Sequence, residues 1–433
     1  MKRTLSPVFR SWVTVLFTVL LCAPLVLAQQ HALNKKILGG YFEEWSIYGA
    51  NYNVANLQQN GVADRMSHLL YAFGNVTGAT PDAQCHLADP WADYQNGGLP
   101  SVSGQPYTSW PFGNFGALIQ LKQLHPGLKI LISLGGASAA NTAGFAFAAS
   151  TEAGRQSLAS SCIDMFIKGN VGADWSGNPV STGSLFDGLD IDWEFPAAAD
   201  KQNFTLLLKE FRKQLNALGK QTGKHYLLTI FAPAGAQNYS NMDLPKVAGQ
   251  VDFMNVQGYD LHGTWESSTN HASSLFDSRK DPSFGQGLFV EAVIEAYLGA
   301  GVPARKLVMG VPLYGRGWMG VAPNNAGLYQ NATGPATSPA GDTLFTDGVA
   351  TYATLSDLPK FNHYFDAKRI ARWIYSPATQ TFWTFDDPLT VTAKMVYVQA
   401  RVPGGLGGAY VWAVKDDDAN GTVMKTMAVG LGR

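Results

Sequence analysis

Short apolar runs with strand character alternate with helical patterns along most of this chain. Eight runs, rich in β-branched and aromatic residues, are predicted as strands. They are Ile37–Phe42, Ser67–Phe73, Lys129–Leu134, Leu185–Trp193, Tyr226–Ala232, Asp252–Gln257, Leu307–Pro312 and Gly408–Trp412. Helices are predicted between them over Gly116–Gln123, Arg155–Lys168, Lys201–Leu218, Leu288–Gly299 and Val391–Arg401.

The clearest helical pattern lies in residues 203–218, where apolar residues recur every three or four positions and share one face. They are Phe204, Leu207, Leu208, Phe211 and Leu215. Strands that alternate with such helices favour a parallel sheet, and eight of these units predict an α/β fold with a closed (β/α)₈ TIM barrel. The alternative, an open doubly wound sheet, lacks its glycine-rich phosphate loop after the first strand.

One interval between predicted strands is too long for a single helix. About 95 residues separate the seventh strand from the eighth, whereas most connections are much shorter. The stretch 318–383 contains Gly-, Ala- and Pro-rich turns and the β-like pair Arg369–Tyr375 and Thr381–Phe385 around Ser376-Pro377. We therefore expect a small α+β lobe, inserted at the catalytic face of the barrel.

The first 28 residues are typical of a secretory signal peptide. Basic residues from Lys2 to Arg10 precede the apolar stretch Trp12–Leu27, and the small residue Ala28 suits the cleavage site. An uncleaved membrane anchor is the alternative, although Pro24 interrupts the short apolar stretch. We expect a mature chain over 29–433 that is secreted, extracellular and free of the membrane after cleavage.

Composition narrows the classes of partner. The full chain has 31 basic and 32 acidic residues, so removing the three basic residues of the signal peptide leaves 28 against 32, a net charge of −4. No basic cluster is present, which disfavours nucleic acid. No cluster of Cys and His suggests a metal, and no cofactor is expected. We expect a monomer, with a large core (46% hydrophobic) and many aromatic residues (12%). The sequence leaves open whether Cys85 and Cys162 pair.

The segment Asp187–Glu194 holds four carboxylates separated by apolar residues. On a β-strand, Asp190, Asp192 and Glu194 share one face. The opposite face carries Leu189, Ile191 and Trp193. Carboxylates on an apolar strand are costly to bury unless they share protons or partners, and such costs are typical of active sites. Asp187 breaks the alternation, so we expect a local irregularity near Gly188.

Glu194 is the last acid of this strand and precedes the chain reversal at Pro196. Reactive groups of a barrel lie at the C-terminal ends of its strands, so we expect Glu194 to be exposed to substrate and to act as a general acid. Neighbouring carboxylates cannot all ionise cheaply, and Glu194 should keep its proton nearer neutral pH than a free glutamate. The alternative is a cation site that uses the same oxygens.

The run from Asp187 to Glu194 resembles the D-G-x-D-x-D-W-E signature of family-18 glycoside hydrolases, the chitinases. Further segments resemble this family in the same order along the chain. They are Ser133-Leu134-Gly135-Gly136 (S-x-G-G), Tyr259-Asp260 (the Y-D of M-x-Y-D), Gly310–Arg316 and Trp412. The resemblance covers residues 36–418, and the predicted lobe resembles the insertion of the deep-cleft chitinase subgroup.

The resemblance implies distinct catalytic roles for the acids. Glu194 would protonate the glycosidic oxygen, and the 2-acetamido oxygen of the substrate would attack to form an oxazolinium ion, with retention of configuration. Asp192 would bind the acetamido N–H and Asp190 would help to cycle the proton. Tyr259 would hold the acetamido carbonyl.

The resemblance also implies residues that bind chitin or N-acetylglucosamine oligosaccharides, because sugar faces stack on aromatic rings. The expected substrate-binding residues are Trp412, Tyr41, Phe73, Asp260, Tyr314, Arg316, Gln257 and Trp265. Trp45, Trp91 and Trp318 are looser candidates for outer subsites.

Two positions depart from the family pattern. Gln257 stands where the family usually has Met, and Ala137 stands where many chitinases have a tryptophan after Gly-Gly. An endo-β-N-acetylglucosaminidase acting on N-glycans or peptidoglycan is one alternative function. A lectin that binds sugar without cleaving it is another. Lectin members of the family typically lose the catalytic glutamate or its aspartate partner, whereas this chain has all three acids, Asp190, Asp192 and Glu194.

Overall fold

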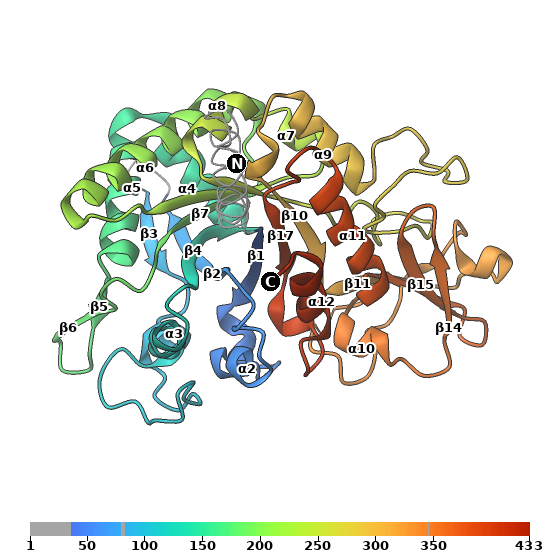
Figure 1. The fold of residues 1–433 in the computed structure, drawn as a ribbon, viewed down its shortest axis with the longest axis horizontal. Coiled ribbons are helices and arrows are strands. Elements are labelled where there is room, and N and C mark those ends of the chain that lie inside the picture. The colour runs from blue at the N-terminus through green and yellow to red at the C-terminus, as the bar shows by residue number, and fades with distance from the viewer. Residues whose placement is uncertain (1–35, 79–82, 345) are drawn as a thin grey trace, which may run out of the picture.

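Eight parallel strands close into a barrel in the computed structural model, which describes residues 36–78, 83–344 and 346–433. The barrel strands are β1 (Ile37–Glu43), β2 (His68–Thr77), β4 (Lys129–Gly136), β7 (Gly188–Trp193), β8 (Leu227–Ala232), β9 (Phe253–Val256), β10 (Leu307–Pro312) and β17 (Gly408–Trp412). They follow the order β1-β17-β10-β9-β8-β7-β4-β2, and pairing of β1 with β2 closes the ring (Figure 1). The prediction of an eight-stranded TIM barrel is confirmed.

Helices surround the barrel, and each predicted helix is present with shifted ends (Figure 1). The longer ones are α3 (Gly113–Leu124), α4 (Ala139–Ser150), α5 (Glu152–Cys162), α6 (Lys201–Thr222), α9 (Val290–Gly299), α11 (Pro388–Ala400) and α12 (Thr422–Gly430). The shorter ones are α2 (Val54–Gln59), α7 (Ala236–Tyr239), α8 (Leu244–Gln250) and α10 (Tyr352–Ser356). The helix predicted over Arg155–Lys168 is divided, because a π-helical turn over Ile163–Ile167 follows α5. The apolar face predicted on α6 is the buried one.

The strand β7 shows the predicted alternation. Leu189, Ile191 and Trp193 lie in the main hydrophobic core between strands and helices, where the Trp193 ring stacks on Phe145 at 5.4 Å. The irregularity predicted near Gly188 is wrong, because β7 pairs with β4 in regular register from Gly188 onward. Asp187 breaks the alternation because it stands before the strand begins.

Asp187 has a structural environment at the start of β7. Its Oδ2 accepts hydrogen bonds from Lys122 Nζ at 2.8 Å and from the backbone N–H of Ile130 at 2.9 Å. The carboxylate therefore joins a helix and two strands at the end of the barrel that is opposite to Glu194.

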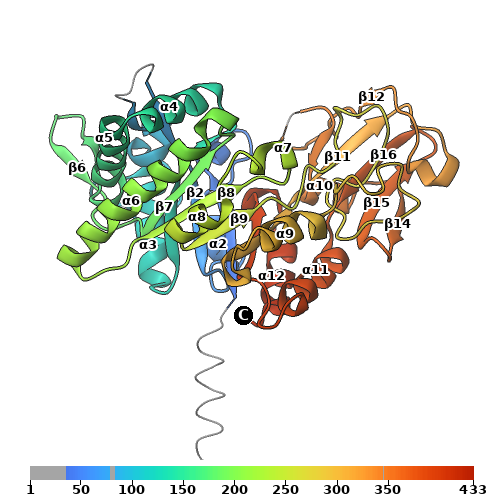
Figure 2. The same cartoon turned by 90° about the horizontal axis from the view of Figure 1, so that it is seen from above.

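A second, antiparallel sheet follows the seventh barrel strand and lies beside the barrel in both views (Figures 1 and 2). Its strands are β11 (Tyr314–Met319), β12 (Gly334–Pro335), β13 (Val349–Thr351), β14 (Asn362–Asp366), β15 (Ala371–Ser376) and β16 (Thr381–Phe385). Its core is aromatic and includes Trp318, Trp373, Tyr375 and Phe382. We call residues 314–385 the lobe; β11 begins two residues after β10, so the lobe is joined closely to a barrel strand.

Three connections were not predicted. A hairpin strand β3 (Gln84–Leu87) pairs with the end of β2, and a small hairpin joins β5 (Asn170–Ala173) to β6 (Pro179–Ser181). Between β9 and α9, residues 257–289 form a long segment without helix or strand.

The structure answers the question that the sequence left open for the cysteines. Cys85 on β3 and Cys162 at the end of α5 form a disulfide, with their Cα atoms 5.0 Å apart.

The predicted signal peptide, residues 1–28, lies outside the described residues. Within the described ranges, no helix combines the length and the apolar character needed to cross a membrane.

Candidate active site

Asp190 lies at the centre of the barrel and is fully buried. Its Oδ2 accepts hydrogen bonds from Tyr41 and Ser133, each at 2.8 Å, and its Oδ1 accepts from Thr229 and from Asn255 Nδ2. Burial raises the pKa of Asp190, and the hydrogen bonds oppose that rise. Four donors from different strands therefore fix this carboxyl group in one orientation.

Asp192 is the next acid toward the C-terminal end of β7, and it is also buried. Among the described residues, no hydrogen-bond partner reaches its Oδ1. Burial raises the pKa of Asp192 well above its usual range, and the charges of Glu194 and Asp190 raise it further. An acid in this position tends to hold or share a proton, and its free oxygen is available to a ligand.

Glu194 directly follows β7 and is only partly buried. Burial and, after it, the negative charge of Asp260 raise its pKa to about 7. The side chain thus carries a proton near neutral pH at the edge of a cavity. This combination suits a general acid that later acts as a base.

Tyrosines line the side of the barrel opposite β7. Tyr259 follows β9, and its hydroxyl lies 3.2 Å from that of Tyr410 on β17. Burial raises the pKa of Tyr259 well above its usual range, so the phenol stays protonated. Its O–H is therefore a donor that can polarise a carbonyl group.

An ion pair between Asp260 and Arg316 joins the barrel to the lobe beside Tyr259. Asp260 Oδ1 accepts a hydrogen bond from Arg316 Nε at 2.9 Å, and Arg316 Nη2 forms an ion pair with the same oxygen at 2.7 Å. The Arg316 guanidinium lies 5.3 Å from the ring centroids of both Trp265 and Tyr314. This forked contact orients the planar group over the cleft.

Aromatic rings form a floor at the end of the barrel where Glu194 lies. The Trp412 ring lies 5.8 Å from Phe73 at an interplanar angle of 22°, and 5.2 Å from Tyr41. Trp45 continues the row by stacking on Phe73 at 5.9 Å. These rings come from the C-terminal ends of neighbouring strands β1, β2 and β17, and they provide planes that suit the apolar faces of sugars.

A cavity of about 470 Å³ opens beside Glu194, which is one of its lining residues. Polar side chains of Gln237, Gln257, Gln286 and Glu266 line it together with Trp265. Glu194 therefore lines an amide-rich cavity at the end of the barrel that also carries the aromatic floor. A proton donor there can reach a ligand in the cavity.

Within the described part of the chain, no group of three His, Cys, Asp or Glu is placed to hold a metal ion. The Asp190 carboxyl group instead meets hydroxyl and amide donors. Such partners suit a site for acid–base chemistry.

A family model described as "Glycosyl hydrolases family 18" matches residues 37–417, which include the whole barrel and the lobe. The chain belongs to this family. The predicted family resemblance is confirmed.

Relatives in family 18 agree with this assignment. Chitinase A1 of Niallia circulans is 33% identical over 425 residues, which cover 87% of this chain and 56% of that relative. The catalytic domain of psychrophilic chitinase B from Arthrobacter TAD20 superposes with a TM-score of 0.82 at 33% identity, covering 92% of this chain and 95% of that one. A class V chitinase from Nicotiana tobaccum, solved in complex with NAG4, has a TM-score of 0.72 at 25% identity and covers 92% of this chain and 99% of its own.

The structure brings most of the predicted family-18 site residues together around Glu194. Tyr41, Tyr259 and Tyr314 lie in one buried cluster, against which Phe73 and Trp412 pack. Trp318 is the exception among the looser candidates. Its ring is fully buried in the lobe core, where Nε1 donates to the backbone carbonyl of Glu266 at 3.2 Å. Trp318 is therefore a packing residue with no surface for a ligand.

The two glycines of the S-x-G-G segment have a structural role. Gly135 (φ +116) cannot carry a side chain, because a Cβ there would lie 2.2 Å from the backbone oxygen of Asp192. A Cβ at Gly136 would lie 2.7 Å from the Phe73 ring. The two glycines therefore let β4 approach the acidic strand and the aromatic floor closely.

The two departures from the family pattern differ in their surroundings. Gln257 lines the cavity, and its Oε1 accepts from the backbone N–H of Ala234 at 3.1 Å, which leaves its amide donors for a ligand. Ala137 is exposed, so this wall has no aromatic plane at that position.

Sequence reasoning missed Thr229, Asn255 and Tyr410. Thr229 lies beside Asp190 in the β7–β8 register, and Asn255 donates to the same carboxylate from β9. A single polar residue in an otherwise apolar strand was the available signal for Thr229 and Asn255. Tyr410 carried no such signal, because aromatic residues are common in strands.

Proposed function

We propose that this chain is a secreted chitinase that hydrolyses β-1,4 linkages between N-acetylglucosamine units. The observation that carries the proposal is Glu194, a carboxyl group with a pKa of about 7 that lines a polar cavity at the end of the barrel where the aromatic floor lies. Export rests on the signal peptide predicted in the first 28 residues. The NAG4 bound to one neighbouring structure supports the substrate class.

The reaction begins with the scissile sugar on the floor made by Trp412. Glu194 donates its proton to the glycosidic oxygen, and the bond to the leaving sugar breaks. The 2-acetamido oxygen of the substrate attacks the anomeric carbon, which forms an oxazolinium ion, so that no second enzymic carboxylate acts as nucleophile. The leaving sugar departs through the amide-lined cavity.

Three side chains support this attack. Asp192 accepts the acetamido N–H through its free oxygen and stabilises the positive charge. Tyr259 donates its O–H to the acetamido carbonyl, which holds that group in line with the anomeric carbon. Asp190, which its hydrogen bonds hold in one orientation, exchanges a proton with Asp192. Glu194, now ionised, takes a proton from water, which opens the oxazolinium ring with overall retention.

The purified protein is expected to cleave soluble N-acetylglucosamine oligomers, with the acetamido group of the substrate as nucleophile. Chromatography of the products from the tetramer to the hexamer measures both rate and cleavage position. Glycoprotein N-glycans and peptidoglycan serve as comparison substrates. Activity on those two alone would contradict the chitinase assignment and favour the related glycosidase function.

Hydrolysis is expected to fall as the pH rises through about 7, because Glu194 must carry a proton and burial sets its pKa there. In Asp260→Asn, a negative charge that raises this pKa is removed, so the alkaline limb of kcat/KM should move to lower pH. Initial rates on one oligomer between pH 4 and 9 measure both profiles. An alkaline limb that stays in place in this variant would contradict the electrostatic link to Asp260.

A further inference from the structure

The outer wall of the cavity beside Glu194 belongs to the segment 257–289, which has neither helix nor strand. Glu266, Gln286 and Leu288 of this segment line the cavity. A segment without regular backbone pairing is held in one conformation only by contacts to its surroundings. The position of these lining side chains therefore depends on whatever fixes the segment.

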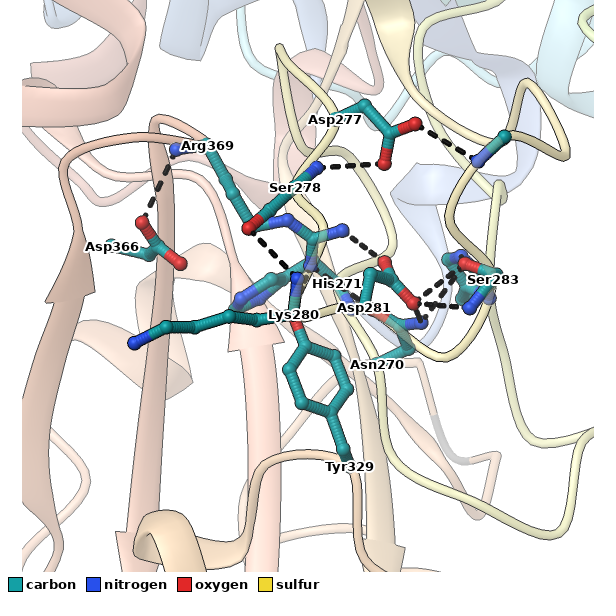
Figure 3. Close-up of polar contacts among 12 residues, drawn as sticks. Asn270, His271, Asp277, Ser278, Lys280, Asp281, Ser283, Tyr329, Asp366 and Arg369 are labelled. Atoms are coloured by element: carbon teal, nitrogen blue, oxygen red, sulfur yellow. Dashed lines mark hydrogen bonds and ion pairs between the residues drawn. The ribbon is translucent and has the colours of Figure 1, made fainter.

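Arg369 of the lobe holds the part of the segment nearest to Asp281 (Figure 3). It stands between β14 and β15, is 1% exposed, and forms an ion pair with Asp281, which is equally buried. Its own backbone carbonyl accepts hydrogen bonds from the N–H groups of Leu275 at 2.8 Å and Phe276 at 3.2 Å. One lobe residue thus holds the segment both through a side chain and through its backbone.

Additional groups fix the Arg369 guanidinium itself. Nη1 contacts the hydroxyl of Tyr329 and lies 3.4 Å from Asn270 Oδ1 (Figure 3). The guanidinium also lies 5.6 Å from the centroid of the Tyr329 ring. Asn270 Nδ2 in turn donates to Asp281 Oδ1 at 2.9 Å. The pair is therefore embedded in a polar network that engages both terminal guanidinium nitrogens, while Nε has no partner among the described residues. Several hydrogen bonds of this kind can hold a buried charge pair in one geometry.

The network continues from Asp281 to the cavity wall. Asp281 Oδ1 accepts from both the N–H and the Oγ of Ser283 at 2.7 Å. Ser283 Oγ lies 3.3 Å from His262 Nε2, and His262 Nδ1 lies 2.9 Å from Glu266 Oε2. The carbonyl of Ser283 accepts the N–H of Gln286 at 3.0 Å. Two cavity-lining residues thus connect to Arg369 through one serine.

We propose that Arg369 is a positioning residue for the leaving sugar: through Asp281 and Ser283 it fixes Glu266 and Gln286 in the wall of the cavity. The ligand class is an N-acetylhexosamine unit on the leaving side of the cleaved bond. This inference rests on the proposed function, since it assigns a leaving sugar to that cavity. Arg369 itself lies outside the cavity and acts only through the segment.

The test compares two substrates with the same sugar on the Trp412 side. One is N-acetylchitotetraose, whose leaving part is sugar; the other is an aryl glycoside of di-N-acetylchitobiose, whose leaving group lacks sugar hydroxyl and amide groups. Arg369→Met should lower kcat/KM for the tetramer by roughly tenfold, mostly through KM, because lining groups are displaced. The aryl substrate should change by less than about twofold.

Two further variants make the outcome decisive. Ser283→Ala leaves the buried ion pair and the backbone hydrogen bond to Gln286 intact, but it removes the Oγ contacts to Asp281 and His262 and with them the link to Glu266. It should therefore show the same dependence on substrate with a smaller loss, and it decides the matter if Arg369→Met does not fold. Arg372→Met is the matched control, because Arg372 lies on β15 and pairs with Asp387; it should affect both substrates alike.

Equal losses on both substrates in Arg369→Met and Ser283→Ala would overturn the positioning role and leave the proposed function standing. A wild-type protein that cleaves neither substrate would overturn the proposed function and this inference together.

Discussion

Glu194→Gln is expected to lower kcat on N-acetylglucosamine oligomers by roughly a thousandfold, because loss of a general acid–base group typically costs two to four orders of magnitude. The amide has nearly the same shape as the carboxyl group but cannot give up a proton to the glycosidic oxygen. The floor made by Trp412 and the cavity wall are unchanged in this variant. Oligomer binding should therefore persist while turnover is lost.

Initial-rate kinetics measure the loss, and isothermal titration with the tetramer measures the binding. Glu152→Gln is a suitable control, since Glu152 is exposed on the first turn of α5 and outside the cavity. It should behave as wild type in both measurements. Near-normal hydrolysis by Glu194→Gln would assign the proton donor to another group, and loss of binding would indicate that the site had been disrupted.

The barrel could be predicted because its pattern is local. Each strand is a short apolar run, and the apolar face of α6 is visible from Phe204 to Leu215. Parallel pairing then leaves few topologies for eight such units. The start of β7 was harder to place: Asp187 appeared to interrupt the strand, whereas Lys122 and Ile130 hold it just before the strand begins.

The acidic strand could be predicted as a site because the cost of burying Asp190, Asp192 and Glu194 is visible in the sequence. The partners of Asp190 are different, since Tyr41 and Asn255 lie 149 and 65 residues away and meet it only after barrel closure. The pairing register of the barrel strands determines which residues become neighbours of Asp190, and the sequence does not specify that register.

Contacts between loops could not be predicted from the sequence for the same reason. Arg369 and Asp281 are 88 residues apart. Arg369 opens a predicted β-like segment and Asp281 lies in no predicted element, so the sequence pattern does not indicate that they pair. Trp318 shows the opposite error. An aromatic residue in a sugar-binding family suggests a subsite, but the burial of its ring in the lobe depends on six strands that meet only in the folded chain.

The disulfide is expected to have the largest effect on stability. Replacing both Cys85 and Cys162 by Ala should lower the free energy of unfolding by roughly 4 kcal/mol, because the bridge closes a long loop and restricts the unfolded chain. The two cysteines are separated by 77 positions, and the closed loop contains α3, β4, α4 and nearly all of α5. A loss of that size is a large fraction of the stability of an ordinary domain.

Denaturant unfolding, followed by tryptophan fluorescence, measures this loss. Reductant should lower the unfolding midpoint of the wild type toward that of the double variant and leave the double variant unchanged. That comparison separates the bridge from the small packing change caused by alanine, since both side chains are buried. Neither cysteine lines the cavity beside Glu194, so the folded double variant should keep its activity. A wild-type midpoint that does not respond to complete reduction would show that packing of β3 against α5, rather than the covalent link, holds this edge of the barrel.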